Sequence, residues 1–268
     1  MRTLELILDG ELMQGDDVKA LQQALADRGF SPGRIDSVFG AATDAAVRAF
    51  QRSEGDLLVD GQAGPRTRAR LGLARDAALP SVADEVTPLI VARMLPDAPI
   101  DNIKANLGSV LDGLRHFGLT DKTMVLMALA TIAAETAGFE PLDEFRSRFN
   151  TSPGGHPFDL YDNRRDLGNR GAPDGARYKG RGYIQLTGRS NYGVIGATIG
   201  VDLEGHPDRA NEAATAGLIL ACYLKDRELK IKSAIIERDF ARARRQVNGG
   251  THGLGNFQTA YLRGEKLI

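Results

Sequence analysis

Residues 123–144 read TMVLMALATIAAETAGFEPLDE, and this stretch decides the fold. It opens as a nearly uncharged apolar helix with no clear polar face, and a helix that is apolar all round is buried on several sides. Glu135 is the first acidic residue of the run, and Gly138 supplies the expected stop signal. The stretch therefore predicts a central buried helix that ends at a single carboxyl group.

A second carboxyl group follows in a different setting. Glu144 lies beyond Pro141 in a looser, acidic segment, whereas Glu135 closes an apolar helix. Apolar and polar surroundings separate two carboxyl pKa values, so that one group stays protonated near neutral pH and the other ionised. Two such groups are the basic apparatus for cleaving a glycosidic bond. The competing interpretation is that Glu135 is only a solvated helix end.

The composition narrows the classes of function. The chain has 268 residues, 42% of them hydrophobic and 26% charged, with a formal net charge of −1. This is long enough for two domains and lacks the basic surplus that a nucleic-acid partner requires. Its apolar runs are too short to span a bilayer, and the N-terminus is a poor signal peptide. The single cysteine, Cys222, fits a reducing compartment, and the four histidines show no zinc-binding spacing, so we expect neither metal nor cofactor.

The first part of the chain contains a short internal repeat at an offset of 24 residues. Ile35-Asp36, Gly40 and Thr43 correspond to Val59-Asp60, Gly64 and Thr67, and each copy leads through a turn into a helix. The blocks GDDVKALQQALADRGF, IDSVFGAATDAAVRAFQ and VDGQAGPRTRARLG resemble the small three-helix peptidoglycan-binding domain of many cell-wall hydrolases. One departure is Ser37, where glycine commonly follows the aspartate. A bare three-helix bundle without binding function would show the same turn residues.

We expect this domain to cover residues 1–73, a linker to cover 74–86 and a second, mainly helical domain to cover 87–268. Within the second domain, residues 145–180 are rich in Gly, Pro, Asn, Arg and Asp and show no sustained period. So long an irregular segment in a compact domain is either functional or disordered. Because Trp is absent, aromatic faces for sugar rings must come from Tyr or Phe, and Tyr161, Tyr178 and Tyr192 are candidates.

Three motifs of the second domain carry a further resemblance. ATIAAETAGFE, YKGRGYIQLTGRSNY and RRQVNGG, in this order, resemble the chitinase-like family 19 glycoside hydrolases, and most of all the branch found in phage endolysins. The resemblance implies an all-α, or mainly α-helical, chain: a small three-helix wall-binding domain followed by a two-lobed, lysozyme-like catalytic domain with a groove between its lobes.

The resemblance also implies roles for individual residues. Glu135 matches the general acid, Glu144 the base that activates water, and Thr187, in a strand-like YIQLT segment, the residue that holds this water. Lys179 and Arg181 are candidates for steering anionic peptide stems, although Arg181 equally fits a buried structural role. The expected substrate-binding residues are Tyr161, Lys179, Arg181, Gln185, Asn191, Tyr192 and Asn248.

The function implied is that of a modular endolysin, a muramidase that cuts the β-1,4 bond between N-acetylmuramic acid and N-acetylglucosamine. Its partner is the glycan strand of peptidoglycan, with no nucleic acid and no insertion into a membrane, and we expect a monomer. The resemblance implies storage in the host cytoplasm until a separate holin opens the membrane. A chitinase of the same fold, a lytic transglycosylase and an inactive wall-binding protein remain alternatives.

Overall fold

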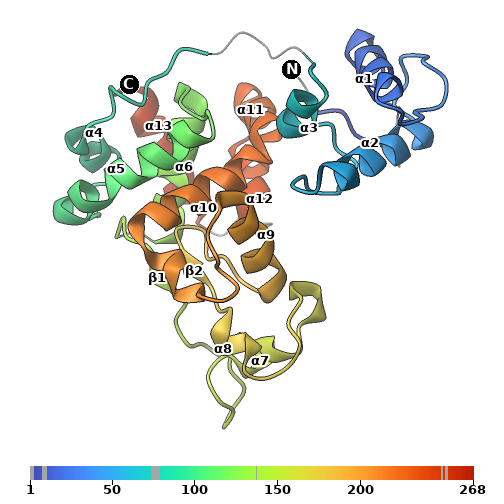
Figure 1. The fold of residues 1–268 in the computed structure, drawn as a ribbon. Coiled ribbons are helices and arrows are strands. Elements are labelled where there is room, and N and C mark those ends of the chain that lie inside the picture. Colours follow the sequence, from blue (N-terminus) through green and yellow to red (C-terminus); the bar gives the residue numbers. More distant parts are fainter. Residues whose placement is uncertain (1–2, 8–10, 74–78, 137, 249, 251–252) are drawn as a thin grey trace. The chain divides into compact units, whose positions relative to one another are not determined.

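The computed structural model describes residues 3–7, 11–73, 79–136, 138–248, 250 and 253–268. It divides the chain into two compact units, Met1–Leu79 with Asp226–Ser233, and Pro80–Lys225 with Ala234–Ile268 (Figure 1). The break after Leu79 falls inside the segment expected to be a linker, of which residues 74–78 lie outside the described part. The elements are almost all helices, with one two-stranded ribbon among the described residues, which confirms the predicted fold class. In that described part, no helix is long and apolar enough to cross a membrane.

The first unit contains the three expected helices. They are α1 (Asp16–Asp27), α2 (Ala41–Glu54) and α3 (Pro65–Arg70), and Pro65 occupies the first helical turn as predicted. Apolar residues at helical spacing on α1 and α2 form the core, because each helix buries only one face. The fully or almost fully buried members include Val18, Leu21, Leu25, Val47 and Phe50.

A buried glutamine organises the first copy of the internal repeat. Gln22 donates from Nε2 to the Asp36 carboxylate at 3.1 Å, to the Val38 carbonyl at 3.0 Å and to the Thr43 hydroxyl at 3.2 Å. Its Oε1 accepts the backbone N–H of Ser37 at 3.0 Å. One side chain thereby ties α1 to the turn and to the first residues of α2.

Gln51 repeats this arrangement in the second copy. Its Nε2 donates to the Asp60 carboxylate at 2.8 Å, to the Gln62 carbonyl at 3.0 Å and to the Thr67 hydroxyl at 3.3 Å, and its Oε1 accepts the Gly61 N–H at 2.9 Å. The 24-residue offset thus reflects two equivalent turns, each closed by a buried amide on the preceding helix.

The second unit is built around α6 (Lys122–Glu135). Asp121 caps this helix by accepting the Met124 N–H at 3.3 Å, and every residue from Met124 to Ile132 is buried. The C-terminal helix α13 (Leu254–Glu265) packs on α6, where a side chain at Gly264 would collide with Leu126. The apolar run therefore does form a central buried helix.

Two glycines allow close packing beside this helix. The helices α5 (Ile100–His116) and α10 (Ala213–Lys225) meet at Gly113 and Gly217, where a Cβ on Gly113 would lie 2.3 Å from the Gly217 carbonyl oxygen. The remaining helices of the second unit, apart from the short ones of residues 145–180, are α4 (Pro88–Met94), α9 (Arg189–Ile199), η2 (Pro207–Asn211) and α12 (Phe240–Asn248). Helix α11 (Glu228–Ile236) lies mostly in the segment that belongs to the first unit.

The segment 145–180 is folded, which argues against the alternative of disorder. It contains the short helices α7 (Asp159–Asp162), η1 (Arg165–Leu167) and α8 (Asp174–Arg177), which form the lower lobe in Figure 1. Strand β1 (Leu142–Asp143) pairs antiparallel with β2 (Arg181–Gly182) at the top of this lobe. The expected strand over YIQLT is wrong: residues 183–185 form a turn, with Gln185 at φ 53°, because Arg181 and Leu186 pair with each other across it.

Candidate active site

Glu135 is the last residue of α6, and the chain beyond it is held by amides from α5. Asn102 donates to the Gly138 carbonyl at 2.9 Å, and the buried Asn106 donates to the Phe139 carbonyl at 3.1 Å. Phe139 is fully buried and takes a positive φ of 55°. These contacts fix the direction in which the chain leaves α6 and thus the position of the Glu135 carboxyl group.

The Glu135 carboxyl group does not have the purely apolar surroundings that we expected. Its Oε1 accepts a hydrogen bond from Arg244 Nη2 at 2.6 Å, in an ion pair that is 14% exposed on the Glu135 side and fully buried on the arginine side. Arg244 lies on α12, in the RRQVNGG motif. A charge-assisted bond of this length is among the stronger hydrogen bonds that a carboxylate can make.

The two-stranded ribbon places Glu144. Leu142 pairs with Gly182 and Asp143 with Arg181, and the Glu144 N–H extends the ladder by donating to the Gly180 carbonyl at 2.8 Å. The carboxyl group of Glu144 is thereby brought next to the YKGRG segment.

Three donors hold the Glu144 carboxylate. Asn150 Nδ2 and the Tyr161 hydroxyl donate to Oε1 at 2.9 and 2.8 Å, and the Gly180 N–H donates to Oε2 at 3.1 Å. An ionised carboxylate accepts but does not donate, so this arrangement suits the charged form. Oε2 keeps room for a further donor, such as a water molecule.

The hydroxyl of Tyr161 stays protonated at neutral pH and donates a hydrogen bond to Glu144. Burial, followed by the hydrogen bond and negative charge of Glu144, raises the pKa of Tyr161 to about 12. We expected Tyr161 to contact substrate. In the structure its hydroxyl instead positions the second carboxylate.

Lys179 and Arg181 both form ion pairs with Asp143. Lys179 Nζ lies 2.6 Å from Asp143 Oδ2, and Arg181 Nε lies 3.1 Å from Oδ1. Burial alone would raise the pKa of Asp143, but hydrogen bonds from Lys179 and Asn211 and the charge of Arg181 lower it. Arg181 is 4% exposed and also contacts Asp208 at 2.8 Å. Of the two expected roles for Arg181, the buried structural one fits the structure.

The expectation that Tyr192 offers a face to substrate is wrong, and the same holds for Tyr178. Tyr192 is fully buried, Tyr178 is 1% exposed, and their rings pack edge-to-face with centroids 5.5 Å apart. The Tyr192 hydroxyl donates to the Lys179 carbonyl at 2.7 Å. Both rings therefore belong to the core that supports the ribbon, where no sugar can reach them.

The other expected residues lie on the turn after β2 and beyond. Gln185 Nε2 donates to the carbonyls of Leu142 and Gly182 at 3.1 and 3.2 Å, so it links the two strands. The partly buried hydroxyl of Thr187 donates to the Gln185 carbonyl at 2.8 Å, which leaves its oxygen free to accept. Asn191 is exposed and donates to the Thr187 carbonyl at 2.7 Å. Asn248 ends α12, but its side chain lies outside the described part.

Sequence reasoning missed Asn150 and Arg244. Arg244 belongs to a motif that was recognised, but only Asn248 of that motif was assigned. Asn150 lies in the irregular segment, where neither spacing nor motif marks it, and its burial is visible only in the structure.

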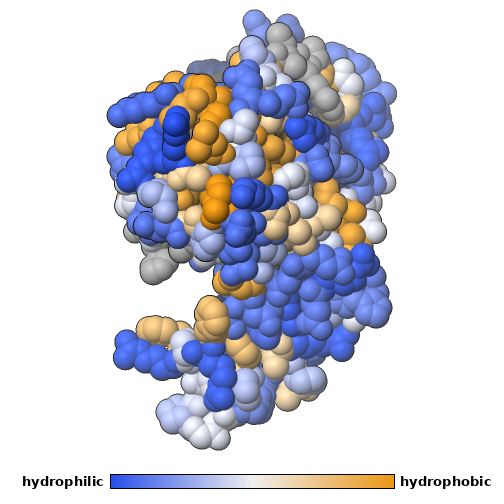
Figure 2. Space-filling model, turned by 90° about the vertical axis from the view of Figure 1, so that its left-hand side faces the viewer, coloured by the Kyte–Doolittle hydropathy of each residue, from blue (hydrophilic) through white to orange (hydrophobic). Residues whose placement is uncertain are grey.

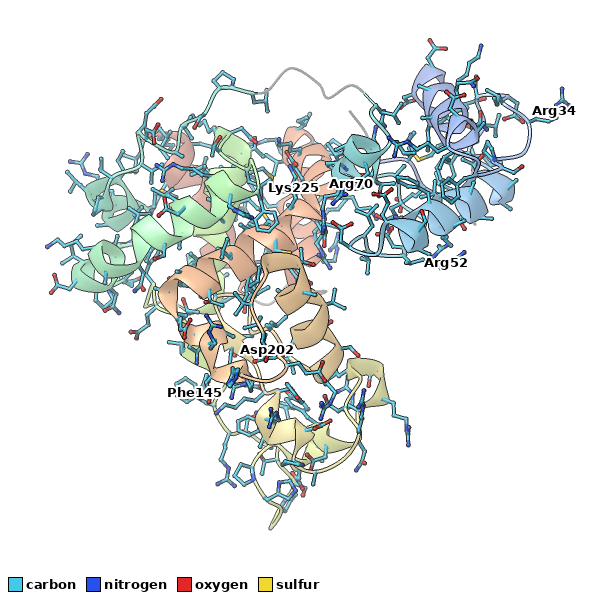
Figure 3. All side chains as sticks on the ribbon, viewed as in Figure 1. Arg34, Arg52, Arg70, Phe145, Asp202 and Lys225 are labelled. Carbon is cyan, nitrogen blue, oxygen red and sulfur yellow. The ribbon has the colours of Figure 1, made fainter. Side chains whose placement is uncertain are left out.

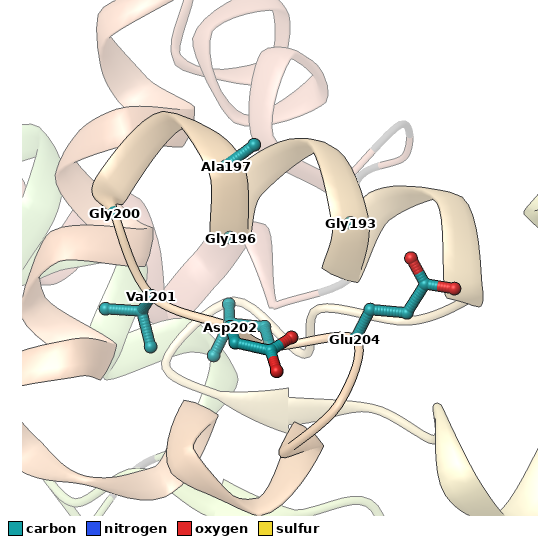
Figure 4. A pocket seen from close by; sticks show the side chains of 8 residues that line it. Gly193, Gly196, Ala197, Gly200, Val201, Asp202 and Glu204 are labelled. Carbon is teal, nitrogen blue, oxygen red and sulfur yellow. The ribbon is translucent and has the colours of Figure 1, made fainter.

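A separate pocket of about 320 Å³ lies between α9 and the segment that follows it (Figure 4). Three of its eight lining residues are glycines and the others are Ala197, Val201, Asp202, Leu203 and Glu204, so it includes none of the expected site residues.

Family comparisons agree with both resemblances. Residues 14–71 match the family model of the putative peptidoglycan binding domain, and residues 161–234 match that of chitinase class I, glycoside hydrolase family 19. The second match begins after Glu135 and Glu144, so the roles of these two residues stay predictions.

Individual relatives also match only parts of the chain. A glycosyl hydrolase family 19 domain-containing protein of Haemophilus influenzae is 32% identical over 35% of this chain and 44% of its own length. A spore cortex-lytic enzyme of Bacillus cereus is 47% identical over 21% of this chain and 22% of its own. The chain thus spans less than half the length of these relatives.

Among solved structures, chitinase C of Streptomyces griseus is similar with a TM-score of 0.47 and 19% identity, over 72% of this chain and 78% of that one. The two family matches cover separate parts of the chain and together indicate its domain organisation. The chain joins a domain of the peptidoglycan-binding type to a family 19 glycoside hydrolase domain.

Proposed function

We propose that the chain is a modular peptidoglycan hydrolase that cleaves the β-1,4 bond between N-acetylmuramic acid and N-acetylglucosamine, with Glu135 as general acid and Glu144 as general base. The observation that supports this most is the setting of Glu144. Three uncharged donors hold its carboxylate, and one of the three donates to Oε2.

In this proposal Glu144 activates the attacking water. Among the described residues, Oε2 accepts one hydrogen bond, from the Gly180 N–H, so it can take a proton from a water molecule. The proposal gives Thr187 the role of accepting from this water, since its own hydroxyl proton goes to the Gln185 carbonyl. A water between the two carboxyl groups implies inversion, which requires them to be about 6.5–9.5 Å apart.

Glu135 donates its proton to the glycosidic oxygen. Once the proton has left, the residue is a carboxylate, and Arg244 is in place to stabilise that charge. The ion pair of the structure corresponds to the state after donation, and the cycle closes when Glu144 releases to solvent the proton that it took from water and Glu135 takes one up.

The first unit would localise the enzyme on the wall, with the domain limits predicted from the sequence: 1–73, a linker over 74–86 and 87–268. The combination of a wall-binding type of domain with a glycoside hydrolase domain favours peptidoglycan over chitin as substrate. We extend this to lysis of a bacterial host by an endolysin, monomeric and stored in the cytoplasm until a holin opens the membrane.

The test is mass spectrometry of fragments released from purified peptidoglycan by the full chain. We expect muropeptides with reducing N-acetylmuramic acid ends, lost in Glu135→Gln and in Glu144→Gln. Glu140→Gln is the matched control, because Glu140 is an exposed carboxyl between the two, and it should keep full activity.

Other products would contradict the proposal in distinct ways. Anhydro ends would indicate a lytic transglycosylase, and cleavage of chitin oligomers alone would indicate a chitinase. No product from either substrate would indicate an inactive wall-binding protein.

A further inference from the structure

Two aromatic rings in the segment that follows Glu144 face solvent. Phe145 is 77% exposed and Phe149 is 74% exposed, the highest values among the aromatic residues that the structure describes as exposed. They belong to the segment Phe145–Phe149, with the sequence FRSRF, which we call the FRSRF loop. Figure 3 shows Phe145 beside the chain that follows β1. Exposed rings grouped among polar residues are typical of a binding surface.

The exposure does not come from a loose chain, because the fully buried Asn150 closes the loop. Asn150 Nδ2 donates to the Phe145 carbonyl at 2.8 Å and to Glu144 Oε1 at 2.9 Å, and its Oδ1 accepts the Ser147 N–H at 2.9 Å. The Phe149 N–H donates to the Ser147 hydroxyl at 3.2 Å. One side chain therefore holds both the loop and the proposed base, so the rings are presented in a fixed position beside the carboxylate.

The loop also carries two positive charges. Arg146 and Arg148 are exposed, and neither forms an ion pair with an acidic side chain in the part of the chain that the structure describes. The guanidinium of Arg148 lies over the Phe149 ring, 4.9 Å from its centroid. Phe and Arg are the residue types enriched in recognition surfaces, and Arg is suited to bidentate binding of carboxylates.

We propose that the FRSRF loop binds the peptide-bearing glycan beside Glu144, with Phe145 and Phe149 against apolar sugar faces and Arg146 and Arg148 on stem carboxylates. This rests on the proposed function and deepens it, since it names what distinguishes peptidoglycan from chitin. Chitin is uncharged, whereas the peptide stems of peptidoglycan carry carboxylates.

The charge and the position of the FRSRF loop both favour a peptide-bearing glycan as its ligand. Lys179 and Arg181 are engaged by Asp143. Arg146 and Arg148 follow Glu144 closely in the chain and form no ion pair among the described residues. Figure 2 shows a notch above the lower lobe, with moderately hydrophobic side chains among hydrophilic ones on its lower lip. A surface that mixes apolar and polar groups in this way suits a sugar chain with charged branches.

The test compares two substrates with the full chain. One is purified peptidoglycan, and the other is the same glycan after an amidase has removed its stems. We expect the double variant Arg146→Gln/Arg148→Gln to raise KM about tenfold on the first substrate, with kcat unchanged, and to leave the second unaffected. The double variant Phe145→Ala/Phe149→Ala should raise KM on both substrates, because sugar rings are common to them.

Leu89→Ala and Arg93→Gln are the matched controls, because both residues are exposed on α4. All these positions are exposed, so the variants should keep the wild-type melting temperature. An equal effect of the arginine variant on both substrates, or no effect on either, would overturn the inference.

The remaining outcomes are also decisive. Binding of the wild type to phosphatidylglycerol vesicles that the arginine variant loses, with unchanged kinetics on peptidoglycan, would reassign the loop to a membrane surface. Failure of the wild type to cleave either glycan would instead refute the proposed function, which keeps the two failures distinguishable.

Discussion

Glu135 and Arg244 lie 109 positions apart in the chain, yet their side chains meet at 2.6 Å. The contact joins the end of α6 to α12, and it is made by a fully buried guanidinium. A buried charge must be compensated, so α12 cannot pack in this position without a carboxylate opposite it. The ion pair therefore links the folding of the C-terminal helices to the geometry of the proposed acid.

Arg244→Gln is expected to remove this compensation. Breaking a buried ion pair costs about 3–5 kcal/mol, so the free energy of unfolding should fall by roughly 3 kcal/mol, and kcat should fall at least tenfold. Arg244→Lys keeps the positive charge but lacks the planar guanidinium with its several N–H donors. It should therefore recover only part of the loss in unfolding free energy and in kcat. Urea unfolding and initial rates on peptidoglycan measure these effects. The neighbouring exposed Arg245→Gln is the control, and an unchanged urea midpoint for Arg244→Gln would contradict the argument.

Tyr161→Phe is expected to lower kcat about tenfold with little change in KM, because it removes one of the three donors that position Glu144. Asn150→Ala removes a second donor and loosens the FRSRF loop as well. If both act through the same carboxylate, the double variant should lose less than the product of the single losses. Fully multiplicative losses would show that Tyr161 acts elsewhere, for instance on substrate as the sequence first suggested.

The longer helices could be predicted from sequence because each depends on a local pattern, whereas the short helices α7, η1 and α8 within residues 145–180 could not. The apolar run from Met124 and the stop near Gly138 define α6, and Asp121 caps it. The position of Glu135 at the end of α6 follows from the same pattern, while its role in the site stays a prediction. The expectation for Tyr192 was wrong because the sequence of a motif does not show whether its aromatic residue lines a groove or is buried in the core.

The long-range partners could not be predicted at all. Asn150 reaches Glu144 through a loop with no regular structure, and Arg244 reaches Glu135 across most of the second unit. Such contacts depend on how the helices pack in three dimensions. The spacing of residues along the chain does not indicate this packing.

The second unit should lose stability in alkaline solution. Burial, the largest cause in each case, raises the pKa of Tyr161, Tyr192 and Tyr261 from 10.0 to about 12. A pKa raised in the folded state contributes stability that is fully present below pH 10 and is lost as the pH rises toward about 12. We expect tyrosinate absorbance to rise together with loss of helical circular dichroism in that window. Gradual titration near pH 10 of all tyrosines, with the helices intact, would contradict this.

Ser37→Gly should stabilise the first unit. Ser37 has φ 66° and Gly61, its counterpart in the repeat, has φ 71°, so both turns need the left-handed conformation. That conformation costs a residue with a side chain about 1–2 kcal/mol, which the greater freedom of glycine in the unfolded chain offsets in part, so the gain should be up to about 1 kcal/mol.

The reverse change, Gly61→Ser, tests the same reasoning from the other side. A Cβ at Gly61 would lie 2.1 Å from Asp44 Oδ1, so this variant should lose more stability than Ser37→Gly gains. Hydrogen exchange of the α1 and α2 amides in the full chain measures both effects without interference from the second unit. If Ser37→Gly left these rates unchanged, the Ser37 N–H bond to Gln22 rather than the backbone conformation would dominate the turn, and Gln22→Ala should then open it.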